Sequence, residues 1–257
     1  MNILPLFMPH NHGIAGSSST FGKDQDLRHD TTFSLSEIVA YSYSPATVPA
    51  YAEDGYISTV IALARHADSF GTSNGNHITK TAAYARTLGK KLGCSAEEIE
   101  TLSMAGLLHD VGKAFIPEAI LTKPGVLSAT EWMIMQQHPV LGVRILRPVI
   151  KLSPALPIVL SHHEHFDGSG YPNKLSGEEI PFGARIIAVV DAFTTMTNGR
   201  VYQKEMTREE ASLELVRCSG KQFDGFVTEA FLDILKEEKN RSEEHPSELQ
   251  SPNTISY

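Results

Sequence analysis

Cysteine is nearly absent from this chain, since only Cys94 and Cys218 occur in 257 residues. Two isolated thiols are too few for a disulfide framework or a thiolate metal site, so we expect packing residues in a reducing compartment. Basic residues are also in the minority: 22 Lys and Arg stand against 30 Asp and Glu, and the formal net charge is −8. A broad basic surface for a nucleic-acid polymer is therefore not expected.

Long apolar runs are lacking as well. No run approaches the roughly 20 apolar residues that a membrane-spanning helix needs. The apolar opening has no basic N-terminal region and is interrupted by Pro5 and Pro9, which argues against a secretory signal peptide. We therefore expect a cytoplasmic protein without membrane contact. Apolar residues make up 41% of the sequence and charged residues 20%, which is typical of a folded globular chain.

Alternating strand patterns are missing, and a helical period runs from about residue 34 onward. Apolar residues recur every three to four positions near 53–70, 74–92 and 95–108, and further helices are expected near 139–147, 154–165, 181–197 and 224–239. Ser95, Ser128 and Thr207 are each followed three residues later by Glu, the pattern of a capping box. The predicted fold is an all-α bundle with a Gly- and Pro-rich break at 166–180.

The two ends of the chain differ from its centre. Residues 1–32 form a lead without helical period from residue 9, rich in His, Gly, Ser, Asp and Thr, and we expect it to be flexible and without chemistry. The folded domain is expected over residues 33–240. The stretch from Arg241 to Ser251 is similar, with one change, to the conceptual translation of a common sequencing adapter. We therefore expect the natural sequence to diverge after about Asn240, and we assign residues 241–257 no function.

Histidine and aspartate supply the candidate metal ligands. His109 and Asp110 follow an apolar helical segment, and at a helix end both side chains can approach one metal, or the carboxylate can bridge two. Asp191 directly follows the apolar run at 186–190, where a buried carboxylate is costly unless it is paired or bound to a metal. The remaining candidates are His77, His138, His162 and His163. Each histidine alone is more often a core or boundary residue than a ligand.

The number and type of these side chains predict a binuclear centre. Imidazoles and carboxylates without thiolates suit iron, manganese, nickel or zinc, and we favour iron or manganese. Six or seven ligands are too many for one tetrahedral ion. They fit two divalent ions that share Asp110, an arrangement that stabilises both the attacking and the leaving oxygen of a phosphoryl displacement.

The order of these residues resembles the HD-GYP family over residues 55–235. The matching stretches are His77, the segment from His109 to Lys113, Ile116 with Pro117, the segment from Lys123 to Gly125, the segment from His138 to Gly142, the string from His162 to Pro172, and Arg185 with Asp191. The resemblance implies an all-α HD-domain bundle with additional C-terminal helices and a centre of two or three metals. It also implies hydrolysis of cyclic di-GMP to linear pGpG, and in some members onward to GMP.

The resemblance also implies a role for each candidate. One metal would be held by His77, His109, Asp110 and Asp191, and the other by His138, His162 and His163 with bridging Asp110. Asp110 and Lys113 are the catalytic candidates, because Lys113 matches a family lysine that faces the substrate phosphate. A salt-bridged surface lysine is the plainer interpretation of Lys113.

The loop that names the family supplies the candidate substrate contacts. These contacts are Gly170, Tyr171 and Pro172, together with Lys113 and Arg185. We expect Gly168 and Gly170 to adopt positive φ angles and Pro172 to fix a turn. A merely structural turn fits the same residues, and Arg185 either contacts substrate phosphate or holds the loop.

Four positions depart from the family pattern. Trinuclear members carry Glu where this chain has Ser73, so we expect two metals rather than three. Lys80 stands in place of Arg, and Thr194 in place of an acidic residue. Gly225 occupies a position that is usually Pro, which we expect to loosen a helix start. Arg200 and Tyr202 match a family Arg-x-Tyr pattern and are expected to anchor loops.

Three functions are compatible with these observations. The preferred one is a cyclic di-GMP phosphodiesterase. The second is a receptor or docking module with little turnover, which binds a cyclic dinucleotide or a diguanylate-cyclase (GGDEF) protein through the Gly-Tyr-Pro loop. The third is an HD phosphohydrolase acting on a mononucleotide or on another cyclic dinucleotide such as cyclic GMP-AMP. A homodimer is compatible with each of them.

Overall fold

The all-α fold predicted from the sequence is confirmed for the part of the chain that the computed structural model describes, residues 48–70, 76–198 and 205–244. Within these residues no strand occurs, and extended backbone pairs only at an isolated bridge between Ser219 and Phe223. None of the described helices is both long and apolar enough to cross a membrane. The predicted lead at 1–32 and the positions Ser73, Arg200 and Tyr202 lie outside the described residues.

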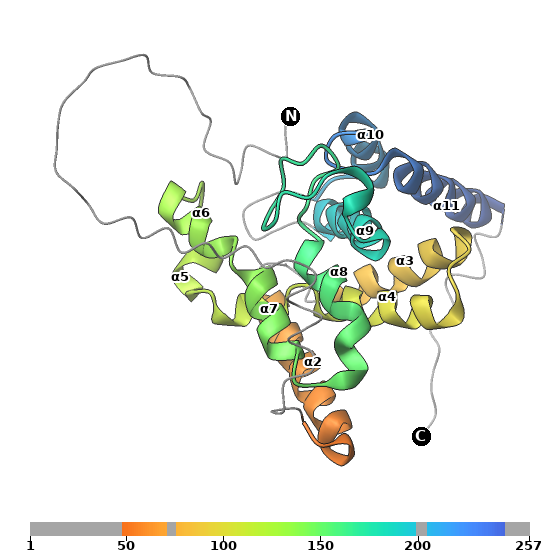
Figure 1. The fold of residues 1–257 in the computed structure, drawn as a ribbon. Helices are drawn as coiled ribbons and strands as arrows, with labels where there is room; N and C mark the ends of the chain where they lie inside the picture. The colour runs from red at the N-terminus through yellow and green to blue at the C-terminus, as the bar shows by residue number, and fades with distance from the viewer. Residues whose placement is uncertain (1–47, 71–75, 199–204, 245–257) are drawn as a thin grey trace, which may run out of the picture.

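The helices follow one another along the chain, and Figure 1 shows how they are arranged. The α-helices are α2 (Glu53–Ser69), α3 (His77–Lys91), α4 (Ala96–Leu108), α5 (Glu118–Leu121), α6 (Ala129–Met135), α7 (His138–Leu146), α8 (Leu156–Ser161), α9 (Phe182–Asn198), α10 (Arg208–Cys218) and α11 (Gly225–Glu244). The 3₁₀ helices are η2 (Ala50–Ala52), η3 (Val111–Phe115), η4 (Ile150–Ala155) and η5 (Gly177–Glu179). Helix α11 thus continues past Asn240, where the adapter-like stretch begins.

The three predicted capping boxes are present at the starts of α4, α6 and α10. In α4 the Ser95 hydroxyl accepts the N–H of Glu98 at 3.3 Å, and the Glu98 carboxylate accepts the N–H of Ser95 at 2.7 Å. Each such cap satisfies N–H groups that a helix start leaves unpaired and stabilises the start by about 1 kcal/mol. The start of α4 is therefore fixed by its own sequence, and its far end delivers His109.

One predicted helix ends earlier than expected. The segment at 154–165 is divided between η4, which contains Pro154, and α8, which ends at Ser161. The N–H of Glu164 bonds the carbonyl of Ser161 at 3.0 Å, so the chain turns instead of continuing the helix. This turn carries His162 and His163 away from the helical path and into the interior.

Two apolar clusters hold the bundle together. One lies mainly between α3, α4, α9, α10 and α11, with Phe193 and Phe231 among its largest buried side chains. The other joins α2, α7 and α8 to the ends of α3 and α4. Helices α3 and α4 approach closely at Gly106, where an added Cβ would lie 2.7 Å from the Cα of Ala82. A larger residue would push α4 away from α3, and with it His109 from His77.

A third, smaller cluster supports α5 and α6, which lie at one edge of the molecule beside α7 (Figure 1). It contains Ile116, Ile120, Leu127 and Met135, with Trp132 packed against it. Because α6 leads directly into α7, this small lobe is tied to the helix start that carries His138.

Candidate metal centre

The seven candidate ligand residues come from five helices and meet in the interior of the bundle. Six of them lie at helix ends: His77 and His138 are the first residues of α3 and α7, and His109, Asp110, His162 and His163 follow the last residues of α4 and α8. Asp191 lies within α9. A helix end lets the backbone change direction, so neighbouring residues can point at one centre. The structure brings together every residue of the predicted set.

The first group consists of His77, His109 and Asp191, each offering a ligand atom within 4.8 Å of the others. The Oδ1 atom of Asp191 lies 2.9 Å from Nε2 of His77 and 3.4 Å from Nε2 of His109. Both imidazoles are buried, and Asp191 reaches them from α9, directly after the apolar run at 186–190. Two nitrogens and one oxygen thus face one small volume, as a divalent ion of borderline softness requires.

The second group consists of Asp110, His138, His162 and His163, again within 4.8 Å of one another. The Nε2 atoms of His138 and His162 lie 3.4 Å apart, and Oδ1 of Asp110 lies 3.2 Å from the former and 3.8 Å from the latter. His163 is half-buried, whereas the other three are buried. This group therefore has one open side.

Asp110 faces both groups. Its Oδ1 atom points at His138 and His162, while its Oδ2 atom lies 3.4 Å from Nε2 of His109 in the first group. A carboxylate whose two oxygens address two sets of ligands has the geometry of a bridge between two cations. The predicted sharing of Asp110 thus fits the arrangement of the side chains.

Hydrogen bonds to the backbone fix which nitrogen three of the four buried candidate histidines present. The Nδ1 atoms of His109, His138 and His162 lie 3.0, 2.8 and 2.7 Å from the carbonyl oxygens of Gly106, Met135 and Val159. A carbonyl only accepts, so in each pair Nδ1 carries a proton, and Nε2 is the nitrogen that faces the centre. Metal-binding histidines are oriented by contacts of this kind.

Two atoms at the heart of the cluster are buried without a hydrogen-bond partner among the described residues. They are Nε2 of His109 and Oδ1 of Asp110. Buried polar atoms are rarely left unsatisfied, and each such group has a cost. A divalent cation in each group would satisfy both atoms, so the residues present fit a metal pair.

The electrostatics of the site keep its ligands in the state that binds cations. Burial opposes ionisation, but Lys113 and His109 hold the pKa of Asp110 well below its usual range, and His109 and His77 do the same for Asp191. Burial lowers the pKa of His138 to about 4 and the pKa of His163 well below 6.5. Both acids are therefore charged and both imidazoles neutral at neutral pH.

His109 behaves differently from the other imidazoles. Burial disfavours its charged form, but the neighbouring carboxylates of Asp110 and Asp191 outweigh it and raise the pKa of His109 to about 10. Without a cation, a proton on His109 offsets part of the charge of the two acids. A metal ion would take over that role and displace the proton.

Lys113 lies one turn beyond the bridging acid, in η3. Its ammonium pairs with Oδ2 of Asp110, and its side chain is 22% exposed. Lys113 is therefore neither a surface lysine nor a fully buried one: it lies at the mouth of the centre. A role in contacting substrate phosphate stays a prediction.

The Gly-Tyr-Pro loop lies against the second group. The Tyr171 ring stacks on His163, with centroids 4.9 Å apart and planes at 28°, and the Tyr171 N–H bonds the His163 carbonyl at 3.1 Å. Tyr171 precedes a cis peptide bond to Pro172. The candidate substrate contacts of this loop are thus adjacent to the ligands, and their contact with substrate stays a prediction.

The two loop glycines serve different purposes, which corrects one expectation. Gly168 has the predicted positive φ, +81°. Gly170 does not, and the prediction for it was wrong. Glycine is needed at position 170 because the backbone of another segment approaches it closely. An added Cβ would lie 2.2 Å from the nitrogen of His165 and 2.5 Å from the Cα of Glu164. Only a residue without a side chain lets the loop fold back on this turn.

Arg185 lies away from both ligand groups. Its Nη1 donates to the Asp224 carboxylate at 2.6 Å, and its Nε donates to the carbonyl of Ile180 at 3.1 Å. These contacts join the end of the Gly- and Pro-rich loop to the start of α11. These contacts are the ones expected if Arg185 holds the loop. A contact between Arg185 and a substrate phosphate stays a prediction.

The departures from the family pattern at Lys80, Thr194 and Gly225, which lie in the described residues, leave the ligand groups intact. Thr194 is buried, and its hydroxyl lies 2.9 Å from that of Thr81. The Lys80 ammonium donates to the side chain of Asn198. The start of α11 at Gly225 is not left uncapped, because the Asp224 carboxylate accepts the N–H of Phe226 at 2.9 Å.

Sequence analysis missed two buried acids beside the site. Asp68 ends a buried stripe of α2 that includes Val60, Ala64 and Ala67, and its carboxylate accepts the N–H of Ile78, next to His77. The signal was available, because an acid on a buried stripe is the feature that singled out Asp191.

The second missed acid is Glu164, which organises the loop. It is 2% exposed, and its two oxygens accept the N–H groups of Asn173 at 2.6 Å and Leu175 at 3.2 Å. Burial raises its pKa. In the sequence Glu164 stood out only as a member of the family string, because its partners lie in an irregular loop.

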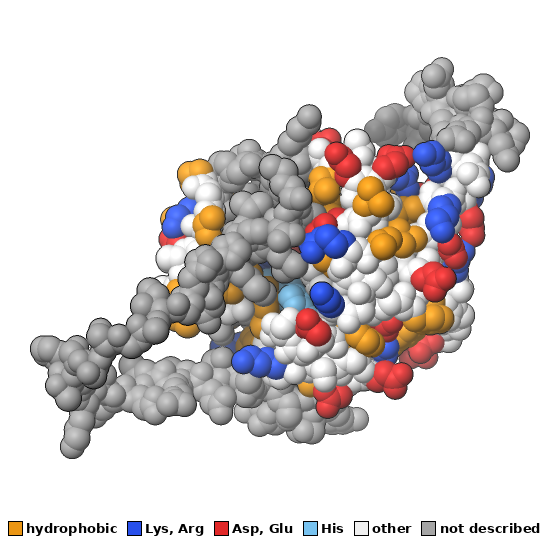
Figure 2. All heavy atoms as spheres, turned by 90° about the horizontal axis from the view of Figure 1, so that it is seen from above, with side chains coloured by type: hydrophobic (Ala, Val, Ile, Leu, Met, Phe, Trp, Pro, Cys, Tyr) orange, Lys and Arg blue, Asp and Glu red, His pale blue; other side chains and the backbone are white. Residues whose placement is uncertain are grey.

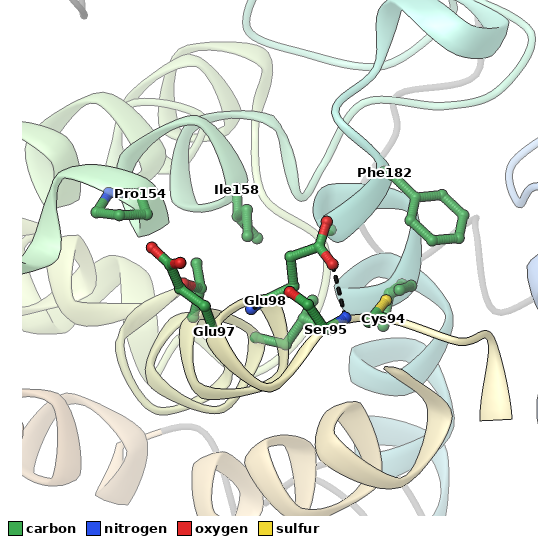
Figure 3. Close-up of a pocket in the computed structure, with 11 residues that line it drawn as sticks. Cys94, Ser95, Glu97, Glu98, Pro154, Ile158 and Phe182 are labelled. Carbon is green, nitrogen blue, oxygen red and sulfur yellow. Dashed lines mark hydrogen bonds between the residues drawn. The ribbon is translucent and has the colours of Figure 1, made fainter. Parts of the chain in front are cut away.

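A separate pocket of about 330 Å³ opens at the start of α4 (Figure 3). It is lined by residues of α4, η4, α8 and α9, including Cys94, Phe182 and Ile158, and by none of the seven candidate ligands. Glu97 and Glu98 also border it, so its charge disfavours an anionic ligand. The ligand cluster is the better candidate for phosphate chemistry.

Figure 2 shows a histidine at the surface of the molecule, with both basic and acidic side chains near it.

Comparisons with known proteins agree with this geometry. A family model described as an HD domain matches residues 59–227. A 3′3′-cGAMP-specific phosphodiesterase of Vibrio cholerae is 38% identical over 173 residues, which cover 66% of this chain and 33% of the relative. A cyclic di-GMP phosphodiesterase of Thermotoga maritima is 39% identical over 165 residues, covering 63% of this chain and 44% of the relative. The chain thus spans less than half the length of these relatives.

A solved structure also has this fold. The cyclic GMP-AMP-specific phosphodiesterase V-cGAP3 from V. cholerae superposes with a TM-score of 0.53 at 21% identity, covering 72% of this chain and 50% of the other. At that identity the likeness concerns the fold alone.

Proposed function

Because the chain belongs to the HD-domain family and, within it, to the HD-GYP group, we propose that it is a metal-dependent phosphodiesterase. Its proposed substrates are cyclic dinucleotides. The observation that carries the proposal is the position of Asp110, whose two carboxylate oxygens face two separate ligand groups. Neither a receptor nor a purely structural domain needs two buried ligand groups around one shared acid.

Divalent metal ions fit the ligand cluster and the family, and the finer details are our proposal. One ion would be held by His77, His109, Asp110 and Asp191, and the other by Asp110, His138, His162 and His163. Iron or manganese is favoured by the mixture of imidazole and carboxylate, with nickel or zinc as alternatives. When bound, such a pair activates a water and neutralises charge on a phosphate.

The residues of the chain then have separate tasks. Asp110 sets the spacing between the two ligand groups. Lys113, at the mouth of the centre, places a positive charge where a non-bridging phosphate oxygen of the substrate would lie. In the reaction a water oxygen bonds to phosphorus, the ribose 3′-oxygen leaves with a proton, and the linear dinucleotide keeps a 5′-phosphate. Asp110 and Lys113 are the proposed catalytic residues.

The open side of the second group is where substrate enters. His163 is the half-buried member of that group, and the loop from Gly170 to Pro172 lies against it. The proposed substrate contacts are therefore Lys113, Gly170, Tyr171 and Pro172. Arg185 supports the loop through Asp224, and a direct contact between Arg185 and substrate is the weaker of its two proposed roles.

Cyclic di-GMP is the proposed substrate, and 3′3′-cyclic GMP-AMP is the second candidate. The relative from Thermotoga maritima is named for the former and a relative from Vibrio cholerae for the latter, at nearly equal identity. The two substrates differ in one purine base, so the metal centre serves both. A diguanylate-cyclase partner, a homodimer and further hydrolysis to GMP stay predictions.

The test is hydrolysis of both cyclic dinucleotides by anaerobically purified protein supplied with Mn²⁺ or Fe²⁺. We expect turnover by the wild type and a loss of at least about 100-fold in Asp110→Ala, because that change removes the shared ligand. Asp54→Ala, an exposed acid on α2, is the matched control. Equal turnover by the wild type and Asp110→Ala would overturn the site assignment. Tight nucleotide binding without turnover in metal-replete protein would favour a receptor instead.

A further inference from the structure

A series of aromatic rings leads from the second ligand group to the surface of α6. Tyr171 stacks on His163, and its ring also lies 6.5 Å from His138 and 5.9 Å from Trp132, both at 81°. Trp132 is the single tryptophan of the chain. The series thus connects two candidate metal ligands to one indole, through the tyrosine that names the loop.

The outer rings of this series are partly exposed, whereas the innermost one is buried. His138 is 1% exposed, while His163, Tyr171 and Trp132 are all half-buried. The rings therefore follow the open side of the second group, the side from which we propose that substrate enters. A molecule bound at the metal ligands and extending outward would pass Tyr171 and reach Trp132.

The Trp132 indole is fixed by apolar packing. It packs against the small cluster of Ile116, Ile120, Leu127 and Met135. Next to it, Glu131 is engaged by Lys123 at 2.5 Å and by the N–H of Ser128 at 2.6 Å. An ordered aromatic surface with its acidic neighbour neutralised is a suitable platform for a nucleobase, because stacking needs little reorganisation.

The chemistry of the substrate requires such a platform. Each phosphate of a cyclic dinucleotide is flanked by two riboses, so a purine base lies one sugar away from the bond that breaks. A base that stacks on an aromatic side chain gains affinity whatever its hydrogen-bonding edge, since every base has a π-face. The metal ligands hold the phosphate but provide no surface for a base.

We propose that Trp132 forms a stacking platform for a purine base of the bound cyclic dinucleotide, with the Tyr171 ring standing nearly perpendicular at its edge. The proposal rests on the proposed function and adds a substrate-binding residue to it. Trp132 contributes to affinity for the base and to the preference for purines, and leaves the metal centre unchanged.

The first test is steady-state kinetics of the Mn²⁺-loaded protein. Trp132→Ala should raise the KM for cyclic di-GMP by about tenfold, with kcat and metal content close to the wild type, while Trp132→Phe should keep most of the affinity. Met133→Ala, which removes an exposed neighbour on α6, is the matched control. The ratio of kcat/KM for cyclic di-GMP over cyclic di-UMP should fall in Trp132→Ala. A wild-type KM in Trp132→Ala, or a loss of kcat and metal with KM unchanged, would overturn the proposal.

The second test uses the fluorescence of Trp132, which has no other tryptophan to obscure it. Rapid mixing of the Mn²⁺-loaded protein with cyclic di-GMP should change the emission within the binding phase, before product accumulates. This readout separates the two proposals. A fluorescence change without hydrolysis would support the platform and sink the proposed activity, and hydrolysis without any fluorescence change would sink the platform and leave the activity standing.

Discussion

Gly112 lies directly against the backbone of His138: a Cβ built on Gly112 would fall 1.9 Å from the His138 carbonyl oxygen. The glycine follows Asp110 by two residues, and His138 begins α7. This contact brings the bridging acid and the first ligand of the second group to their observed separation. The distance from Oδ1 of Asp110 to Nε2 of His138, 3.2 Å, therefore depends on the absence of one side chain.

Gly112→Ala should accordingly separate η3 from α7. Overpacking at such a contact costs about 1–3 kcal/mol of the free energy of unfolding, and we expect the ion of the second group to be lost before that of the first. Urea unfolding and metal analysis of the purified variant check this. Gly55→Ala on α2 is the control, because nothing lies within 4 Å of its added Cβ. A Gly112→Ala protein with full stability and both ions would refute the role of the contact.

Metal binding should release a proton from His109. The pKa of His109 is raised to about 10, so between pH 6.5 and 10 the metal-free protein carries a proton there that a cation must displace. At pH 8 we expect about one proton released per chain, since His138, whose pKa is lowered to about 4, is already neutral. The release should decline as the pH rises through 10.

Calorimetry of Mn²⁺ binding in two buffers of different ionisation enthalpy measures this release. His109→Ala should abolish it. His138→Ala should lose one ion and still release the proton when the remaining ion binds. Release that persists in His109→Ala would show that the proton comes from another group.

Glu164→Gln should loosen the Gly-Tyr-Pro loop without emptying the metal site. Both oxygens of Glu164 accept backbone N–H groups, and an amide would place a donor against one of them. A buried mismatch of this kind costs about 1–3 kcal/mol. We expect lower stability and a higher KM with normal metal content, and Glu178→Gln on the same loop, at an exposed position, should do neither. Loss of metal in Glu164→Gln would place the residue in the centre itself.

Asp68→Ala should weaken metal binding at the His77 group. The Asp68 carboxylate accepts the N–H of Ile78 at the start of α3, so its removal frees the backbone that carries His77. Loss of such an outer contact lowers metal affinity by roughly tenfold or more. Competition with a chromophoric chelator measures the change, and Asp68→Asn, which keeps an acceptor, should lie between the wild type and Asp68→Ala. Equal metal affinity in the wild type and both variants would show that Asp68 does not support the His77 group.

The candidate ligands could be singled out from the sequence because the choice depends on residue type and order, and the structure brings these side chains together. A buried carboxylate such as Asp191, which follows an apolar run, is costly unless it is paired or bound to a metal. Imidazoles and acids at helix ends are therefore natural candidates for its partners. The helix starts at Ser95, Ser128 and Thr207 could be predicted because a capping box is local. These features need no knowledge of distant contacts.

Other features depend on contacts that no local pattern reveals. Gly170 is required by the backbone of Glu164 and His165 folding back on it, and a sequence does not distinguish this from a positive φ. Arg185 finds Asp224 across 39 residues, so its role was left open between two alternatives. Asp68 followed the same rule as Asp191 but lay outside the matched family stretches, and it was overlooked.

The central claim is that two cations share Asp110, and the most direct measurement is anomalous diffraction from crystals of the protein loaded with Mn²⁺ or Fe²⁺. We predict two anomalous peaks on either side of the Asp110 carboxylate, one beside His77, His109 and Asp191 and the other beside His138, His162 and His163. A single peak, or peaks that do not contact Asp110, would contradict it.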